Sequence, residues 1–173
     1  MKEMTADRGT KGAARAILSG GVIAGVLDII FAFLFYGLHN HLSPVRILQT
    51  VASGVLGKAA FSGGASAAAL GAVFQLVIPI GAAAIYYAAS RGVRVLIERP
   101  VLCGVLYGIA IYAVMNFVVV PLSAVPGKRS FPLVMVLPAL LAHMFLIGLP
   151  IALCVRRYSE PPSGPLPRRA GTP

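Results

Sequence analysis

The chain has 173 residues, of which 58% are hydrophobic and 12% are charged, and its mean hydropathy is +0.86. An average soluble domain is about 45–50% apolar and about 25% charged, so this composition excludes a soluble globular domain, a disordered chain and a disulfide-stapled mini-protein. The formal charge is +10, from 15 Lys and Arg against 5 Asp and Glu. The sequence predicts an integral membrane protein of one compact unit.

A basic N-terminal arm, residues 1–16, precedes the first long apolar stretch, residues 17–38. A secretory signal peptide is the rival interpretation, but its apolar core is about 7–15 residues long and is followed by a small-residue cleavage site. This run is longer and ends in aromatic and apolar residues from Phe35 to Leu38. We therefore expect an uncleaved first membrane helix, whose single charge is Asp28.

The segment 43–60 is too polar to cross a membrane. Ser43 is a preferred helix cap and Pro44 suits the first helical position, so an amphipathic helix is predicted to begin here. Two placements are open, a helix lying in the membrane interface and a re-entrant piece that folds back into the membrane, and the interfacial helix is favoured. The expected apolar face holds Leu48, Val51, Ala52, Val55 and Ala59, and the expected polar face holds Arg46, Gln49, Thr50, Ser53 and Gly57.

Three further apolar stretches, residues 66–89, 101–125 and 132–155, reach the length of about 20 residues that a membrane-spanning helix needs. Helices are expected because lipid offers no partners to the backbone, and no ten-residue segments of alternating polarity indicate a barrel. The predicted fold is all-α: an integral membrane four-helix bundle over residues 17–157, with one extra amphipathic or re-entrant helix.

Lys and Arg are distributed unequally between the two sides of this bundle. Eleven lie in the N-terminal arm, the link 90–100 and the C-terminal tail, whereas four lie in the loops of the other side. This asymmetry places both termini in the cytoplasm. It also explains the net charge without nucleic acid, since a nucleic-acid site would gather its basic residues on one soluble face. The tail, residues 158–173, is basic and rich in Pro, and we expect it to be disordered.

Each predicted span carries one strongly polar residue near its middle. At a rise of about 1.5 Å per residue, the four lie within roughly 5 Å of one another in depth. Small residues lie on the same helix faces as these polar residues, and small residues are typical of helix faces that pack closely. We therefore expect them to point into the bundle as a midplane polar cluster: Asp28, Gln75, Asn116 and His143.

This cluster has two interpretations. In the first interpretation, it is a proton or ion relay, or a substrate site. Ionisable residues are costly to place inside a membrane, so their presence there indicates a function. Alternatively, it is a set of interhelical hydrogen bonds that fixes helix packing. Gln75 and Asn116 fit the structural interpretation, whereas Asp28 argues for function, since an amide would serve packing without the ionisation penalty. We expect Asp28 to interact with His143 across the bundle.

Other motifs are weak. Gly54–Lys58 lacks the spacing and the final Ser or Thr of a phosphate-binding loop. His39 and His41 have no nearby carboxylate or thiolate for a metal, and a single buried histidine does not hold a haem. Cys103 and Cys154, at predicted cytoplasmic helix ends, are expected to be free thiols. No catalytic motif is found, so we expect no enzyme activity, cofactor or metal.

Three stretches, Gly20–Ala32 (GGVIAGVLDIIFA), Arg46–Gly64 (RILQTVASGVLGKAAFSGG) and Met115–Ser123 (MNFVVVPLS), carry a resemblance. With them the chain resembles a group of small four-span bacterial inner-membrane proteins of uncharacterised function, over about residues 17–157. The resemblance implies a bacterial plasma membrane and the same four-helix layout. It implies no activity, substrate or functional residue.

The functional hypothesis is a multi-pass protein, in contact with the lipid bilayer, that moves or senses a proton or small solute. The rival is a non-transporting structural or accessory subunit of a membrane complex. An isolated four-helix bundle has little room for an aqueous path, so a transporter would be a homo-oligomer or part of a larger complex. A water-accessible cavity reaching Asp28 favours the first hypothesis, and a dry, fully satisfied polar cluster favours the second.

Overall fold

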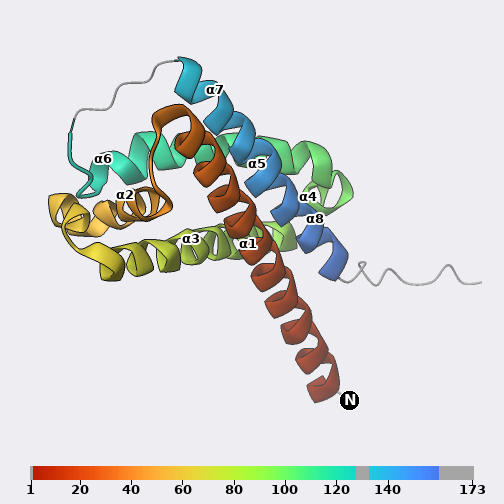
Figure 1. Cartoon of the computed structure of the whole chain (residues 1–173). Helices are drawn as coiled ribbons and strands as arrows, with labels where there is room; N and C mark the ends of the chain where they lie inside the picture. Colours follow the sequence, from red (N-terminus) through yellow and green to blue (C-terminus); the bar gives the residue numbers. More distant parts are fainter. Residues whose placement is uncertain (1, 128–132, 160–173) are drawn as a thin grey trace, which may run out of the picture.

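The computed structural model describes residues 2–127 and 133–159, with side chains from Thr10 onward, and the described chain is all-α (Figure 1). This confirms the predicted all-α fold. The predicted disordered tail lies almost wholly outside the described residues. The elements in chain order are α1 (Lys2–Asn40), α2 (Pro44–Leu56), η1 (Gly57–Phe61), α3 (Gly64–Gly92), α4 (Val95–Glu98), α5 (Pro100–Val114), η2 (Met115–Val119), α6 (Val120–Leu122), α7 (Leu133–Ala142), η3 (His143–Gly148) and α8 (Leu149–Tyr158).

Four helical stretches are long and apolar enough to cross a membrane: Thr10–Asn40, Gly64–Gly92, Pro100–Leu122 and Leu133–Tyr158. They coincide with the four predicted spans, so the chain is a multi-pass membrane protein. The third span is built from α5, η2 and α6, and the fourth from α7, η3 and α8. Many large apolar side chains point outward, as a lipid-facing surface requires, among them Leu34, Val77, Leu106 and Phe117.

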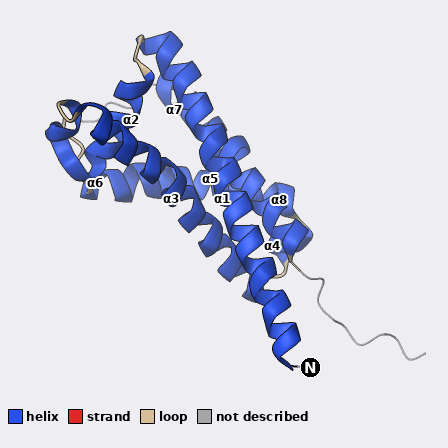
Figure 2. Cartoon of the chain, turned by 60° about the horizontal axis from the view of Figure 1, so that its bottom comes forward, coloured by secondary structure: helices blue, strands red, loops and turns tan. Residues whose placement is uncertain are grey.

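The two ends of the bundle differ. At one end, here the α4 end, α4 and the last turns of α8 lie beside the other helices (Figure 1). Toward the other end, here the α2 end, α1 and α7 diverge from α3 and α6, and α2 lies on the α3 side of the opening (Figure 2). The helix α1 continues without a break through the N-terminal arm, starting at Lys2.

The α4 end is closed by a packed core. Its buried residues come from α1, α3, α5 and the fourth span, and Tyr86, Ile151 and Val155 are almost completely buried. The Tyr86 hydroxyl donates to the Leu96 carbonyl at 2.9 Å and so ties α3 to α4. Its ring also meets the ring of Tyr107 edge to face, with centroids 4.9 Å apart.

Glycines allow the helices to approach backbone to backbone, as the small-residue faces predict. A Cβ at Gly25 of α1 would lie only 2.7 Å from the Gln75 carbonyl oxygen of α3. A Cβ at Gly108 of α5 would collide with the backbone of His143 and Met144. A Cβ at Gly104, one turn earlier in α5, would lie 2.9 Å from the Cα of Leu149 at the start of α8. These contacts fix where α1 meets α3 and where α5 meets the fourth span.

The helix α2 begins as predicted, because the Ser43 hydroxyl accepts from the Arg46 N–H at 3.3 Å and Pro44 occupies the first turn. The prediction of its polar face is wrong in part. Gln49 and Ser53, expected on the polar face, are buried at 6% and 0% exposure.

The physical reason is that α2 packs on protein. Its backbone at Leu48 lies against Gly71 of α3, where a side chain would not fit. Gln49 is buried because its amide donates to the Gly64 carbonyl at 3.1 Å. Buried polar groups are tolerated when they find such partners. The C-terminal half of α2 also meets the residues after α6, since the Ala124 N–H donates to the Gly54 carbonyl at 2.9 Å.

Candidate functional site: a cavity around Asp28 and His143

Asp28 and Gln75 meet where α1 crosses α3. The Gln75 Nε2 donates to the Asp28 Oδ2 at 2.5 Å. Gly25, almost one turn before Asp28, brings the two backbones together at this level. Pro79 has no N–H to bond the Gln75 carbonyl four residues earlier, so the Gly25 Cα–H faces a carbonyl without its usual helical partner. The crossing therefore holds one oxygen of the carboxylate on a fixed donor.

His143 is held by its own helix and by α5. Its Nδ1 lies 2.8 Å from the Ala139 carbonyl oxygen, which accepts only, so Nδ1 carries a proton. Nε2 is therefore the nitrogen that gains or loses a proton. The ring meets Tyr112 edge to face, with centroids 5.3 Å apart. Behind it the His143 carbonyl packs on Gly108, so both the ring and the backbone of His143 are positioned.

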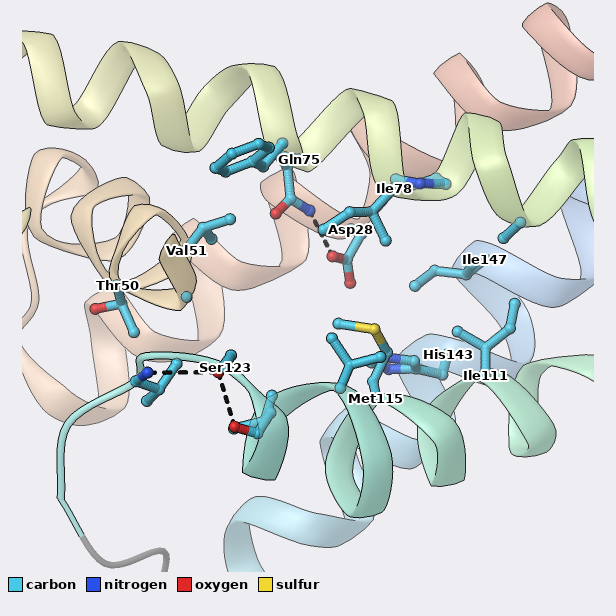
Figure 3. Close-up of a pocket in the computed structure, with 17 residues that line it drawn as sticks. Asp28, Thr50, Val51, Gln75, Ile78, Ile111, Met115, Ser123, His143 and Ile147 are labelled. Carbon is cyan, nitrogen blue, oxygen red and sulfur yellow. Dashed lines mark hydrogen bonds between the residues drawn. The ribbon is translucent and has the colours of Figure 1, made fainter. Parts of the chain in front are cut away.

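Asp28 and His143 face each other across a cavity, shown in Figure 3. This central cavity has a volume of about 290 Å³. Two neighbouring cavities, of about 320 and 420 Å³, also have Asp28 and His143 in their walls. Each of the two side chains makes its hydrogen bond elsewhere, Asp28 to Gln75 and His143 to Ala139. The predicted interaction of Asp28 with His143 stays a prediction, and it would act through the cavity and not through a direct hydrogen bond.

The predicted polar cluster is largely brought together. Gln75 lines the central cavity and the cavity of about 420 Å³. Asn116 does not line the central cavity, but it lines the cavity of about 320 Å³ together with Asp28 and His143. The Asn116 amide donates to the Tyr112 carbonyl at 2.9 Å. Asp28 and His143 are thus the residues common to all three cavities, and the amides lie on either side of them.

The central cavity has apolar walls around these polar groups. Thr50 and Ser123 add hydroxyls, each bonded to a backbone carbonyl of its own segment. Within the described part of the chain, no Lys or Arg lines the cavity, so Asp28 faces only His143 as a possible positive charge. The apolar lining consists of Val51, Phe74, Ile78, Pro79, Ala82, Ile111, Met115, Val119, Val120, Val125 and Ile147.

The central cavity extends toward the α2 end. Its wall includes Thr50 and Gly54 of α2, and Ser123 and Val125, which follow the end of the third span at Leu122. In the opposite direction it ends near Ala82, whose carbonyl accepts from the Tyr107 hydroxyl at 2.7 Å. Below this bond lies the packed core of the α4 end. The cavity therefore joins mid-depth to one end of the bundle, with a closed floor toward the other.

Asn116 and His143 both lie in π-helical turns, η2 and η3. Each turn is followed, after one residue, by a proline, Pro121 or Pro150. A proline lacks an N–H and its ring presses on the carbonyl four residues earlier, and the wider turn relieves this crowding. Such turns are frequent at functional sites. The prolines downstream of each polar residue were a sequence signal for local widening that the hydropathy pattern did not use.

Sequence reasoning missed the contribution of α2 and of two tyrosines. Thr50 and Gly54 form a wall of the central cavity, and Tyr36 and Tyr112 line its neighbours. The motif stretch Gly54–Lys58 thus enters the site through Gly54 alone, in the wall of a cavity and not in a phosphate loop. A glycine four residues after Thr50, and therefore on the same face of an amphipathic helix, was the available signal.

The remaining candidates lie apart from this site. The His39 ring stacks on Phe35 with centroids 5.7 Å apart. Among the described residues, no three His, Cys, Asp or Glu side chains gather as a metal site. Cys103 and Cys154 are free thiols, the first buried with its sulfur 3.4 Å from the Val95 carbonyl oxygen.

No protein-family model, curated protein or solved structure matches this chain. Its function is therefore inferred from the geometry of the chain itself.

Proposed function

We propose that this multi-pass membrane protein takes up a proton or a small solute at Asp28 and His143 and moves it across the membrane or senses it. The central cavity carries the proposal, because it runs from the α2 end to two ionisable side chains at mid-depth. We further propose, from the resemblance to small four-span bacterial inner-membrane proteins, that the membrane is a bacterial inner membrane, and from the distribution of Lys and Arg that both termini lie in the cytoplasm. The α2 end then faces outward.

The chemistry of the pair supports this function over a purely structural one. A carboxyl group within a membrane span costs about 2.5–3.5 kcal/mol or more to insert when charged. Asn at position 28 would bond Gln75 equally well without that cost. The Asp28 carboxyl and the His143 Nε2 can each carry a proton, so a proton can pass between them through the cavity. Neither group belongs to an enzyme-like triad, and the proposal involves no bond-breaking chemistry.

The test is proton movement in liposomes that contain the purified full-length chain and a pH-sensitive dye. We expect a pH gradient to dissipate faster with the wild type than with empty liposomes, and Asp28→Asn or His143→Gln to abolish the difference while both variants stay folded. Gly81→Ala, at an exposed position of α3, is the control. If Asp28→Asn lowered the free energy of unfolding and left every flux unchanged, the cluster would be structural, as in an accessory subunit.

A further inference from the structure

The central cavity combines a carboxylate, apolar walls and a small volume, and we infer that it binds a small organic cation, a protonated amine or quaternary ammonium with an apolar body. This inference rests on the proposed function and names the class of its solute. It is carried by three observations: the charge that faces the cavity, the character of the walls, and the position of the floor.

The charge comes from Asp28. Its Oδ2 accepts from Gln75, while its other oxygen points into the cavity (Figure 3). No Lys or Arg of the described chain lines the cavity, and His143 keeps Nδ1 engaged with Ala139. With a neutral imidazole and an ionised carboxylate, the site carries one uncompensated negative charge at mid-depth in the bundle. A cationic ligand would compensate it, whereas an anionic ligand would add a second like charge.

The walls select against a bare inorganic ion. Mg²⁺ and Ca²⁺ need six or more oxygen ligands, and here Asp28 and Gln75 are surrounded by aliphatic side chains. Phe74 and Met115 add a ring and a polarisable sulfur to that surface. An apolar pocket with a few convergent polar groups is typical of small-molecule sites, and aromatic faces attract ammonium groups. At about 290 Å³, the cavity lies just below the usual range of about 300–1,000 Å³ for such sites, which favours a small ligand.

The closed floor of the cavity sets where a cation stops, and the titratable pair sets how a cation competes with a proton. A cation entering from the α2 end would stop beside Asp28, above the bond between Tyr107 and Ala82. The titratable side chains that line the three cavities are Asp28, Tyr36, Tyr112 and His143. If the Asp28–His143 pair holds one proton in the empty site, a cation that binds the ionised carboxylate releases that proton toward the α2 end. Cation and proton then compete for one site.

The experiment measures binding by calorimetry to the full-length chain in lipid nanodiscs, with empty nanodiscs subtracted. The probes are benzyltrimethylammonium, its uncharged isostere neopentylbenzene, and the anion phenylacetate. A quaternary ammonium has no titratable proton, so any pH dependence reports the protein. We expect one benzyltrimethylammonium per chain, at least tenfold weaker binding of both other probes, and an apparent affinity that rises by up to tenfold per pH unit while the pair is protonated.

Two variants assign the site. Asp28→Asn should weaken binding of the cation at least tenfold. Gly54→Leu should do the same by filling the cavity, since a Cβ at Gly54 meets no atom within 4 Å and the helix can accept a side chain there. Gly81→Leu is the matched control: it also has open space at Cβ but lies on an exposed face of α3 and should bind like the wild type.

The outcomes separate the inference from the proposed function. Equal binding of the cation and its uncharged isostere, both blocked by Gly54→Leu, would overturn the cationic ligand and keep a solute site. No binding of any probe, with proton movement still dependent on Asp28, would overturn the ligand and leave a proton pathway. If Asp28→Asn changed neither cation binding nor proton movement, both the cationic ligand and the proposed function would be overturned.

Discussion

At the scale of single residues, the site depends on which partner each polar group has. Asp28 is bonded to Gln75 on the neighbouring helix, whereas His143 is bonded to Ala139 within its own. The carboxylate is thus tied to α3, and the imidazole is tied to the fourth span. A change at one of the two ionisable groups should therefore leave the hydrogen bond of the other intact.

Double-mutant cycles test this partition. Asp28→Ala and Gln75→Ala, each of which removes the hydrogen bond, should be coupled in the free energy of unfolding by about 0.6 kcal/mol and at most about 1.7 kcal/mol, the average and the maximum found for interhelical hydrogen bonds in membranes. Asp28→Asn and His143→Gln should be coupled more weakly than that, because no hydrogen bond joins them. Unfolding in mixed micelles provides the measurement. A coupling of Asp28 with His143 larger than that with Gln75 would contradict the observed pairing.

The residue scale also shows what the sequence alone can reveal. Four polar residues at one depth, each on a face with small neighbours, were enough to predict Asp28, Gln75 and His143 around one space. The identity of the hydrogen-bond partners was not predictable, because it depends on the crossing of α1 with α3 and on the widened turn at His143. Hydropathy records depth and face, and it does not record the distance between facing groups.

At the scale of helices, close approach at glycines holds the site in place. Gly108 is the clearest example, since its Cα lies against the backbone of His143. Backbone cannot move aside as the end of a side chain can, so a larger residue must push α5 away from η3. The position of the imidazole therefore depends on a residue that carries no functional group.

We expect Gly108→Leu to lower the free energy of unfolding by about 1–3 kcal/mol through overpacking, and to reduce whatever activity depends on His143. Gly81→Leu, with open space at its Cβ, should stay within about 0.5 kcal/mol of the wild type. Thermal unfolding in detergent compares the two. Equal stability of both variants would show that α5 and η3 are farther apart than described here.

The helix α2 is the element whose placement the sequence predicted least well. Its start could be predicted, because Ser43 and Pro44 are local signals. The sequence did not predict which of its residues are buried. An apolar face indicates the buried side of a helix only when the helix packs against lipid. The helix α2 packs against protein instead. Its buried Gln49 donates to the Gly64 carbonyl, and Gly71 of α3 allows the backbones of α2 and α3 to come into contact. Long-range partners of this kind leave no local pattern.

Single-cysteine labelling tests the orientation of α2. Thr50 is exposed and Ser53 is fully buried, although both belong to the face expected to be polar. With the native thiols replaced by Ala, a membrane-impermeant maleimide should react with Thr50→Cys at least tenfold faster than with Ser53→Cys. Equal rates would indicate a helix lying free in the membrane interface.

At the scale of the whole molecule, the four spans converge at the α4 end and open toward the α2 end (Figure 2). Hydropathy predicted the spans well, since each contains a long apolar window. It did not predict that α1 and α7 diverge from α3 and α6. We attribute this divergence to the prolines, to the π-helical turns and to the packing of α2 beside α3. The divergence creates the cavity and so converts a polar cluster into a site.

We expect water to reach Asp28 and His143 from the α2 end and from nowhere else. In a chain without Cys103 and Cys154, single cysteines at Asp28, Ile111 and Lys58 report the depth of access, and Gly81→Cys reports lipid-facing background. The cationic methanethiosulfonate MTSET crosses no bilayer and reacts with thiolates, which form only where water reaches. Its reaction is measured in sealed membranes from each side separately.

We predict that Asp28→Cys and Ile111→Cys are modified from the same side as Lys58→Cys, which marks the α2 end, and that Gly81→Cys stays unmodified. Modification of Asp28→Cys and Ile111→Cys only from the opposite side, or no modification of either while Lys58→Cys reacts, would contradict an open path from the α2 end to the midplane pair.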